Sequence, residues 1–481
     1  MKRETTRVIL AGALVLAAGC ATGPDFKTPA APASVNYEAG EDVRTAAARG
    51  PGGVAQHFNP AAEISGPWWE AFGSGDLNAA VQTALTNSPT LAQALARLRR
   101  AQEEYRAASG GLRYPEMEAG LSAARKKVNP EAMGMTGVPE PDPFSLFNAS
   151  VSVSYAFDLF GKNRRTLEAL KAQVDRRDIE LGGARQTLAA NVVLAHLRLA
   201  ETEKRLTAAR EVVAARQEQL NIARKRWEAG GISASDLELQ GLALAQAQAA
   251  LPSLEQQRGQ LGRQLAVYLG REPAEAIQTP LDLDDLRLPE EVPASLPAEV
   301  AKQRPDIRAA EAVWRQACAN VGVATADLYP RIALTASLGS QTTEAGDLLG
   351  SLNVWSVGAD LMQPVFHGGE LRAKKRAAVA AYDEAAAAYR ETVLRGLQEV
   401  ADALQALQTD ARELAARSDA ANHARVVLDT ATKQQEEGGL SQAALLDAKI
   451  RQLQAEGERI SAQAARLADT AVLFHALGGR W

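Results

Sequence analysis

Residues 220–236 read LNIARKRWEAGGISASD, and 208 positions later residues 428–444 read LDTATKQQEEGGLSQAA. Each stretch ends a long heptad pattern and then has two glycines, an aliphatic residue and a serine. The heptad positions of the first copy are Val192, Leu199, Leu206, Val213, Leu220 and Trp227, and those of the second are Val400, Leu407, Leu414, Ala421, Leu428 and Gln435. This pattern predicts two long helices that end in the same turn, and therefore an internal duplication.

The two helices are predicted to be unusually long. Residues 162–227 and 369–438 contain no proline, and at 1.5 Å per residue the first run would reach about 100 Å. Both runs carry charged side chains throughout, so we expect them in water rather than in a bilayer. Within this pattern, Gly182-Gly183 is expected to weaken the first helix locally. Pro252 is expected to kink the return helix that follows Gly230-Gly231.

Between the helical stretches the hydrophobic period changes to two, which predicts four strands. Their apolar faces are Met117, Ala119, Leu121 and Ala123; Phe147, Ala149, Val151, Val153, Tyr155 and Phe157; Ile332, Leu334, Ala336 and Leu338; and Trp355, Val357, Ala359 and Leu361. A length of about ten residues with strict alternation is typical of transmembrane barrel strands. A half-buried strand of a soluble sheet has the same alternation, so the pattern alone leaves both open.

The N-terminus has the form of a bacterial export signal. Three basic residues precede an apolar run, residues 8–18, which is too short to span a bilayer and is followed by Gly19-Cys20. A cysteine at this position resembles the lipoprotein signal, in which the thiol is diacylated. Ordinary secretion with a free Cys20 is the alternative. Residues 21–66 are rich in proline, glycine and alanine, and they predict an extended strap without a core of its own.

Composition argues against several classes of function. The formal net charge of −5 argues against strong nucleic-acid binding. The two cysteines, Cys20 and Cys318, are too few for a disulfide framework or a zinc cluster. The five histidines are scattered, and no phosphate-binding loop or nucleophile elbow is found. We therefore expect no enzyme, no metal and no cofactor apart from lipid on Cys20.

Each half of the chain has the order helix, two strands, long helix, turn, helix. Four strands cannot close a barrel, and open strand edges are not tolerated in lipid. If the strands span a membrane, several chains must share one barrel, and the charged helices must extend from it as a soluble bundle. A lipid-anchored assembly of this kind would be a conduit across the periplasm.

The predicted segments follow the same order. They are a signal peptide (1–19), an acylated strap (20–66), equatorial and upper helices (67–112), a barrel hairpin (113–160), a long helix with turn and return helix (161–271), an equatorial connector (272–303), an upper helix (304–328), a second barrel hairpin (329–366) and a second long helix with turn and return helix (367–481).

Four stretches together resemble the outer membrane efflux proteins, which are TolC-like channels, and especially their lipoprotein branch with OprM and the NodT-type factors. The stretches are Trp68-Trp69-Glu70-Ala71-Phe72, Arg304-Pro305-Asp306-Ile307-Arg308-Ala309-Ala310-Glu311, Tyr329-Pro330-Arg331-Ile332-Ala333-Leu334-Thr335-Ala336 and Ala476-Leu477-Gly478-Gly479-Arg480-Trp481. The resemblance covers essentially the whole mature chain. It implies an α+β homotrimer with a 12-stranded outer membrane barrel, an α-helical periplasmic barrel and an equatorial belt that contains the Trp68 region and the connector.

The resemblance also implies a function. The family forms the passive exit duct of tripartite pumps for drugs, toxic compounds or metal ions, with a periplasmic adaptor and an inner-membrane transporter, commonly of the resistance-nodulation-division type. Two alternatives remain open from the sequence: an exit duct for type I protein secretion, and a periplasmic coiled-coil lipoprotein without a pore. The transported compounds are not readable from the sequence.

The resemblance places two kinds of site at the periplasmic end. Leu445-Leu446-Asp447-Ala448 resembles the family's aperture motif, with Asp447 as the aperture aspartate, although the position three earlier, acidic in TolC, is Ala444. An ion pair between Asp447 and Arg451, one helical turn on, is the alternative. The adaptor would contact the two turns, although glycine termination of a helix explains their glycines equally well. The turn residues are Gly230, Gly231, Ile232, Ser233, Gly438, Gly439, Leu440 and Ser441.

Overall fold

The computed structural model describes residues 22–30, 32, 44–59, 66–130, 132, 134–137, 139–277, 281–294, 297–348, 350 and 352–478. The predicted signal peptide, Cys20 and part of the strap lie outside the described residues. By its contacts the chain divides into two units, one with the described residues of Met1–Thr28, Leu98–Arg177 and Ala310–Tyr389, and one with those of Pro29–Arg97, Asp178–Ala309 and Arg390–Trp481. Within the described ranges, no helix combines the length and the apolar character needed to cross a membrane.

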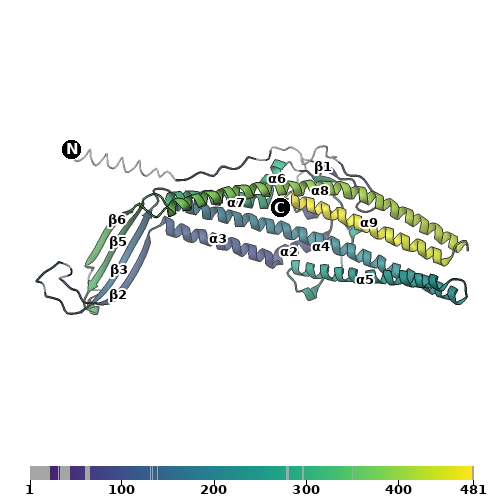
Figure 1. The fold of residues 1–481 in the computed structure, drawn as a ribbon, viewed down its shortest axis with the longest axis horizontal. Helices are drawn as coiled ribbons and strands as arrows, with labels where there is room; N and C mark the ends of the chain where they lie inside the picture. Colours follow the sequence, from purple (N-terminus) through teal and green to yellow (C-terminus); the bar gives the residue numbers. More distant parts are fainter. Residues whose placement is uncertain are drawn as a thin grey trace. The chain divides into compact units, whose positions relative to one another are not determined.

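The helix boundaries confirm the internal duplication. Helices α4 (Lys162–Glu228) and α8 (Glu370–Glu436) each have 67 residues, and helices α5 (Ala234–Tyr268) and α9 (Gln442–Ala476) each have 35. Adding 208 to either end of α4 or α5 gives the ends of α8 and α9. Figure 1 shows α8 and α9 side by side, joined by their turn. The same local pattern therefore forms the same helical hairpin twice.

Helix α4 shows no break at Gly182-Gly183. A Cβ atom on Gly183 would lie 3.1 Å from Cβ of Pro305, the first residue of helix α7 (Pro305–Ala326). The missing side chain therefore permits a close approach between these two helices. Pro252 lies inside α5, which continues as a single helix beyond it.

The four predicted strands form one antiparallel sheet in the first unit. They are β2 (Glu116–Lys126), β3 (Phe144–Phe157), β5 (Arg331–Thr342) and β6 (Val354–Met362), and they lie in the order β2-β3-β5-β6 (Figure 1). Because side chains alternate between the faces of a strand, the register decides whether the apolar positions coincide. The register places the apolar positions of the four strands in common rows, such as Met117, Val153, Ala336 and Val357. The row beside it is polar, with Glu118, Ser152, Ser337 and Ser356.

The sheet leaves both its apolar face and its two outer strands uncovered. Neither β2 nor β6 pairs with a further strand in the described part of the chain. Leu121 and Trp355 are each 76% exposed, and Val357 is 74% exposed. Large exposed apolar areas and open strand edges are found where lipid or another chain covers them. This arrangement is what a shared membrane barrel requires of each chain.

The second unit has its core around the tryptophan pair. In the 3-10 helix η1 (Trp68–Phe72), Trp68 and Trp69 are buried, and Trp68 packs against Phe474 of α9 with 5.8 Å between ring centroids. The connector joins this core: Leu283 is fully buried, and Arg287 N donates to Phe72 O at 2.9 Å. The two segments assigned to the predicted belt therefore share one core.

The remaining elements are short or connect the others. They are β1 (His57–Asn59), α2 (Gly75–Asn87), α3 (Pro89–Arg113), η3 (Pro273–Glu275), η4 (Leu283–Asp285), β4 (Glu291–Pro293), α6 (Pro297–Gln303) and η5 (Ala345–Asp347). The sequence analysis missed the parallel pair of β1 and β4, because strands of three residues are too short to show a period.

The strap is fixed to helix α9 by a buried arginine. The Arg466 guanidinium is fully buried and donates to Gly52 O at 3.0 Å, Val54 O at 2.8 Å and Thr45 Oγ1 at 2.9 Å. Burial lowers the pKa of Arg466. Residues 44–59 of the predicted strap are held by hydrogen bonds to the main chain that the composition of the strap did not reveal.

His196 on α4 is a buried histidine, and in the described structure neither of its ring nitrogens has a hydrogen-bond partner. Burial lowers the pKa of His196 to about 4, so the unfolded chain binds the proton more readily than the folded one. The free energy of unfolding should therefore be highest above pH 6.5 and fall as the pH drops toward 4, by about 3 kcal/mol at most.

Replacing this histidine by leucine, His196→Leu, should remove that part of the acid sensitivity. Urea unfolding of the detergent-solubilised protein at pH 7.5 and pH 4.5 measures it. His423→Leu is the matched control, because His423 is exposed. An equal pH dependence in the wild type and His196→Leu would contradict the assignment.

Candidate functional site

The two double-glycine turns have the same backbone geometry. Gly230 has a φ of 73° and Gly438 a φ of 77°, a left-handed conformation that glycine adopts without a steric penalty. In each turn the next glycine donates its N–H to the carbonyl five residues earlier, at 2.7 Å in the first and 2.8 Å in the second. This is the hydrogen bond of a Schellman-type helix end. The predicted turn residues therefore form two equivalent, well-defined corners.

The serine of each turn starts the return helix. Ser233 Oγ accepts from Asp236 N, and the Asp236 carboxylate accepts from Ser233 N at 3.1 Å, which together make a capping box. Hydrogen bonds from the Ser233 side chain and backbone lower the pKa of Asp236. Ser441 accepts from Ala444 N at 3.3 Å, but Ala444 has no carboxylate to return a second bond. The first turn is thus capped more completely than the second.

Asp447 lies near the start of α9 and is bound to helix α4. Its Oδ1 accepts from Gln219 Nε2 at 2.8 Å and lies 3.5 Å from Arg216 Nη1. Gln219 Nε2 also lies 3.3 Å from Ala443 O. The carboxylate therefore ties α9 to α4 instead of pairing with Arg451 along its own helix. With 48% of its side chain exposed, Asp447 remains accessible to solvent and ions.

Apolar and charged contacts continue this link between α4 and α9. Leu446 and Ile450 are buried against Ala215 of α4. Lys449 Nζ lies 3.3 Å from Glu211 Oε2. Sequence analysis did not identify the α4 partners, because Gln219 and Asp447 are 228 positions apart and no local pattern relates them.

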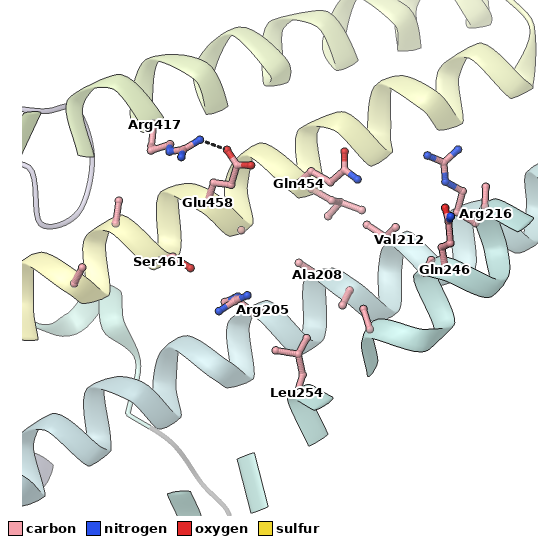
Figure 2. Close-up of a pocket in the computed structure, with 18 of the residues that line it drawn as sticks. Arg205, Ala208, Val212, Arg216, Gln246, Leu254, Arg417, Gln454, Glu458 and Ser461 are labelled. Carbon is pink, nitrogen blue, oxygen red and sulfur yellow. Dashed lines mark hydrogen bonds and ion pairs between the residues drawn. The ribbon is translucent and has the colours of Figure 1, made fainter. Parts of the chain in front are cut away.

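Further along the hairpins, a groove of about 920 Å³ lies between α4, α5, α8 and α9 (Figure 2). Arg205 and Arg216 of α4 line it, together with small residues such as Ala208. At its border, Arg417 of α8 pairs with Glu458 of α9 (Figure 2). The α4/α5 pair and the α8/α9 pair are therefore not fully packed against each other here, which leaves space for a shift between them.

The described residues offer no support for a metal centre. No group of three or more histidine, cysteine, aspartate or glutamate side chains in these ranges is arranged to hold a metal ion. Cys318 is buried, its Sγ lies 3.5 Å from Pro24 O, and burial raises the pKa of its thiol. It is a small packing residue.

Residues 22–26, which follow shortly after Cys20, are held in a defined position in the first unit. Thr22 donates from N and from Oγ1 to Phe160 O, at 3.1 and 2.9 Å. Arg165, with 5% of its side chain exposed, donates to Thr22 O at 3.3 Å and to Asp25 Oδ1 at 2.7 Å. The chain is thus held beside the start of α4, immediately after the segment that links it to β3.

Close backbone packing holds the same segment from its other side. A Cβ atom on Gly23 would lie 2.5 Å from Cα of Gly322 on α7, and a Cβ atom on Gly322 would lie 2.7 Å from Cγ of Arg165. Phe26 meets Trp314 edge to face, with 5.4 Å between centroids. Sequence analysis missed this docking, because single glycines at positions 23 and 322 carry no local signal.

The sequence model of the family described as outer membrane efflux protein matches residues 80–271 and 296–479. The pyoverdine export outer membrane protein OpmQ of Pseudomonas aeruginosa is 32% identical over 422 residues, which are 86% of this chain and 87% of the relative. The probable efflux pump outer membrane protein TtgC of Pseudomonas putida is 29% identical over 470 residues, 96% of this chain and 93% of the relative.

Solved structures of outer membrane channels share the fold. The structure of the outer-membrane channel OprN superposes with a TM-score of 0.82 at 28% identity, and covers 96% of this chain and 100% of that one. The Campylobacter jejuni CmeC outer membrane channel has a TM-score of 0.84 over 96% of this chain and 95% of that one. At 21% identity, the second likeness concerns the fold alone.

Proposed function

Because this chain belongs to the outer membrane efflux protein family, we propose that it is the exit duct of a tripartite pump and works without chemistry of its own. It is an outer membrane efflux channel with a large periplasmic part. Its partners in the pump are a periplasmic adaptor and an inner-membrane transporter of the resistance-nodulation-division type. The observation that carries the proposal is the four-stranded sheet. The register of its strands places their apolar side chains in common rows on one face, and its edge strands β2 and β6 are open.

The duct is a homotrimer. Three chains supply twelve strands, and the β6 edge of each chain pairs with the β2 edge of the next, so that no edge is left open to lipid. The exposed apolar face then meets the hydrocarbon, and the row with Ser152, Ser337 and Ser356 faces the lumen.

The cargo is a small compound: a drug, another toxic compound or a metal ion. Relatives of similar identity carry names that refer to pyoverdine export, toluene efflux and antibiotic efflux. Because relatives of one family carry names with such different compounds, the duct itself does not select the compound. These names also favour a pump for small compounds over a duct for protein secretion.

The periplasmic end is gated by the link between α4 and α9. Asp447, held by Arg216 and Gln219, forms a carboxylate ring in the trimer that narrows the opening and attracts cations. Opening then requires the two helix pairs to shift, and the groove between them provides space for that shift.

Asp447→Ala should raise the single-channel conductance in planar bilayers severalfold and weaken block by divalent cations, because both the carboxylate ring and its link to α4 are lost. Asp429→Ala is the matched control, since Asp429 is an exposed acid near the end of α8. If Asp447→Ala conducts like the wild type and is blocked equally by divalent cations, the ring does not exist. A wild-type protein that forms no channel at all would instead refute the duct.

The mature N-terminus is lipidated on Cys20. The docking of residues 22–26 supports this, because it fixes the segment that begins two positions after Cys20 in the sequence. The segment that follows the anchor is thereby held next to the link between β3 and α4.

Mass spectrometry of the purified protein tests the lipidation. The N-terminal peptide of the wild type should begin at Cys20 and carry the mass of a diacylglyceryl group and one further acyl chain, whereas Cys20→Ser should carry neither. A wild-type peptide with a free Cys20 thiol would show that the protein is exported without an anchor.

A further inference from the structure

We propose that the two double-glycine turns are not equivalent docking points, and that the end of α4, with Trp227 and three basic residues, binds an acidic helical segment of the adaptor. The equivalent end of α8 lacks this capacity. The inference rests on the proposed function, because it assumes that an adaptor reaches the turns. The inference names the turn that the adaptor recognises by charge, and it names the chemistry of the adaptor segment that binds there.

The difference between the turns lies in their side chains and not in their backbones. Both turns have the same left-handed glycine and the same closing hydrogen bond. Residues 224–229 read RKRWEA, with three bases and one acid, whereas the aligned residues 432–437 read TKQQEE, with one base and two acids. The two copies therefore share the backbone of the turn, but the helix end before it is net positive in the first copy and net negative in the second.

After the charge difference, the exposure of Trp227 is the second observation that indicates a contact with another molecule. It occupies the last position of the heptad, where the earlier residues of α4, such as Leu199 and Leu206, are almost completely buried. Trp227 is nevertheless 45% exposed. Its counterpart Gln435 is a polar, half-buried residue. A large aromatic side chain at a seam position, left open to solvent, is typical of the anchor residues of an interface.

Two of the three basic side chains next to Trp227 are free to meet a partner. Arg224 and Lys225 are exposed and form no ion pair within the described part of the chain. Arg226 faces Asp236 and lines a small cavity of about 260 Å³ behind the turn. The acids nearby are Glu228, the last residue of α4, and Asp236 and the exposed Glu238 on α5, so the end of α4 keeps an excess of positive charge. The positive face is therefore confined to the last turn of α4.

An acidic partner fits this surface better than a basic or neutral one. Single exposed ion pairs contribute little and are screened by salt, so charge alone would give weak, sign-dependent binding. An apolar side chain of the partner against Trp227 supplies the anchor, and the three cations select the charge beside it. The second turn, with Glu436, Glu437 and no aromatic residue, offers neither.

Two synthetic helical hairpins test the proposal with the full-length protein in detergent. They share a leucine-bearing turn and differ only in having glutamate or lysine at the helix ends next to it. Fluorescence anisotropy should show that the glutamate hairpin binds at least tenfold more tightly than the lysine hairpin, and that 0.5 M salt reduces the difference. Equal binding of the two hairpins would overturn the proposal.

Exchange of side chains between the turns supplies the matched variants. Arg224→Thr, Arg226→Gln and Trp227→Gln together give the end of α4 the residues of α8 at these three positions, and should weaken binding of the glutamate hairpin at least tenfold. The reciprocal variant, Thr432→Arg, Gln434→Arg and Gln435→Trp, should create a second site. Unchanged binding in the first variant would refute the assignment to α4.

Two further measurements keep this test separate from that of the duct. Single-channel conductance of the first variant should equal that of the wild type, because no residue of the Asp447 link is altered. Its oligomer should also keep its size in light scattering. An oligomer that falls apart would show that a second copy of the chain covers Trp227, which would overturn the adaptor site but not the channel.

Discussion

Replacement of Val153 by arginine should prevent the protein from entering the outer membrane, whereas arginine at the neighbouring Ser152 should be tolerated. Val153 lies in the apolar row with Met117, Ala336 and Val357. An arginine near the bilayer midplane on the lipid face of a barrel costs about 2–4 kcal/mol, and a trimer would carry three. Ser152 points to the opposite face, where an arginine would meet the water of the lumen.

The measurement is the fraction of heat-modifiable oligomer in outer membrane preparations, together with refolding into lipid vesicles. Val153→Arg should give little oligomer and poor refolding, and Ser152→Arg should match the wild type closely. The two variants place the same side chain, with the same added charge, at neighbouring positions of β3, and these positions lie on opposite faces of the sheet. If both insert equally well, or if Ser152→Arg is the defective one, the apolar face does not meet lipid.

Loss of the Arg304 guanidinium should be the most destabilising single change in the second unit. Only 6% of the side chain is exposed, and it donates to Ala476 O at 2.8 Å and to the carboxylates of Asp306 and Glu399 at 2.7 and 2.5 Å. Burial opposes the charge, but the hydrogen bonds to Asp306 and Glu399 outweigh it and raise the pKa of Arg304. The same arginine lowers the pKa of Asp306, against the effect of burial.

Arg304→Leu leaves these acceptors without their donor, and it should lower the free energy of unfolding by about 3–5 kcal/mol. Urea unfolding followed by circular dichroism in detergent measures the loss. Arg304→Lys keeps the charge but not the forked geometry, and should fall between the wild type and Arg304→Leu. Arg315→Leu is the control, because the Arg315 side chain is 39% exposed and its pair with Glu311 is expected to contribute about 1 kcal/mol or less. Equal stability of Arg304→Leu and Arg315→Leu would contradict a structural role for the buried cluster.

The candidate site could be read from the sequence only in part. The sequence predicts the turn residues and Asp447 as site residues, and the backbone positions of the turns follow from the glycines and the serine caps. That Asp447 binds Gln219 and Arg216 was not predictable, because these residues belong to different halves of the chain. The exposure of Trp227 was also unexpected, since its heptad position predicts burial. A periodic pattern shows which face a residue occupies, but not where its neighbouring helix ends.

Local periodicity in the sequence is enough to predict the long helices and the four long strands of this protein. Two helices of 67 residues and two of 35, repeated after 208 positions, follow from heptads that end at glycine, and the faces of four strands follow from alternation. The tertiary structure alone decided that these four faces coincide, that β3 pairs with β5, and that Arg165, Arg304 and Arg466 are buried. Such pairings depend on contacts between segments more than 90 residues apart, as between Arg304 and Glu399. A buried guanidinium has the same sequence context as a solvated one until its acceptors are brought to it.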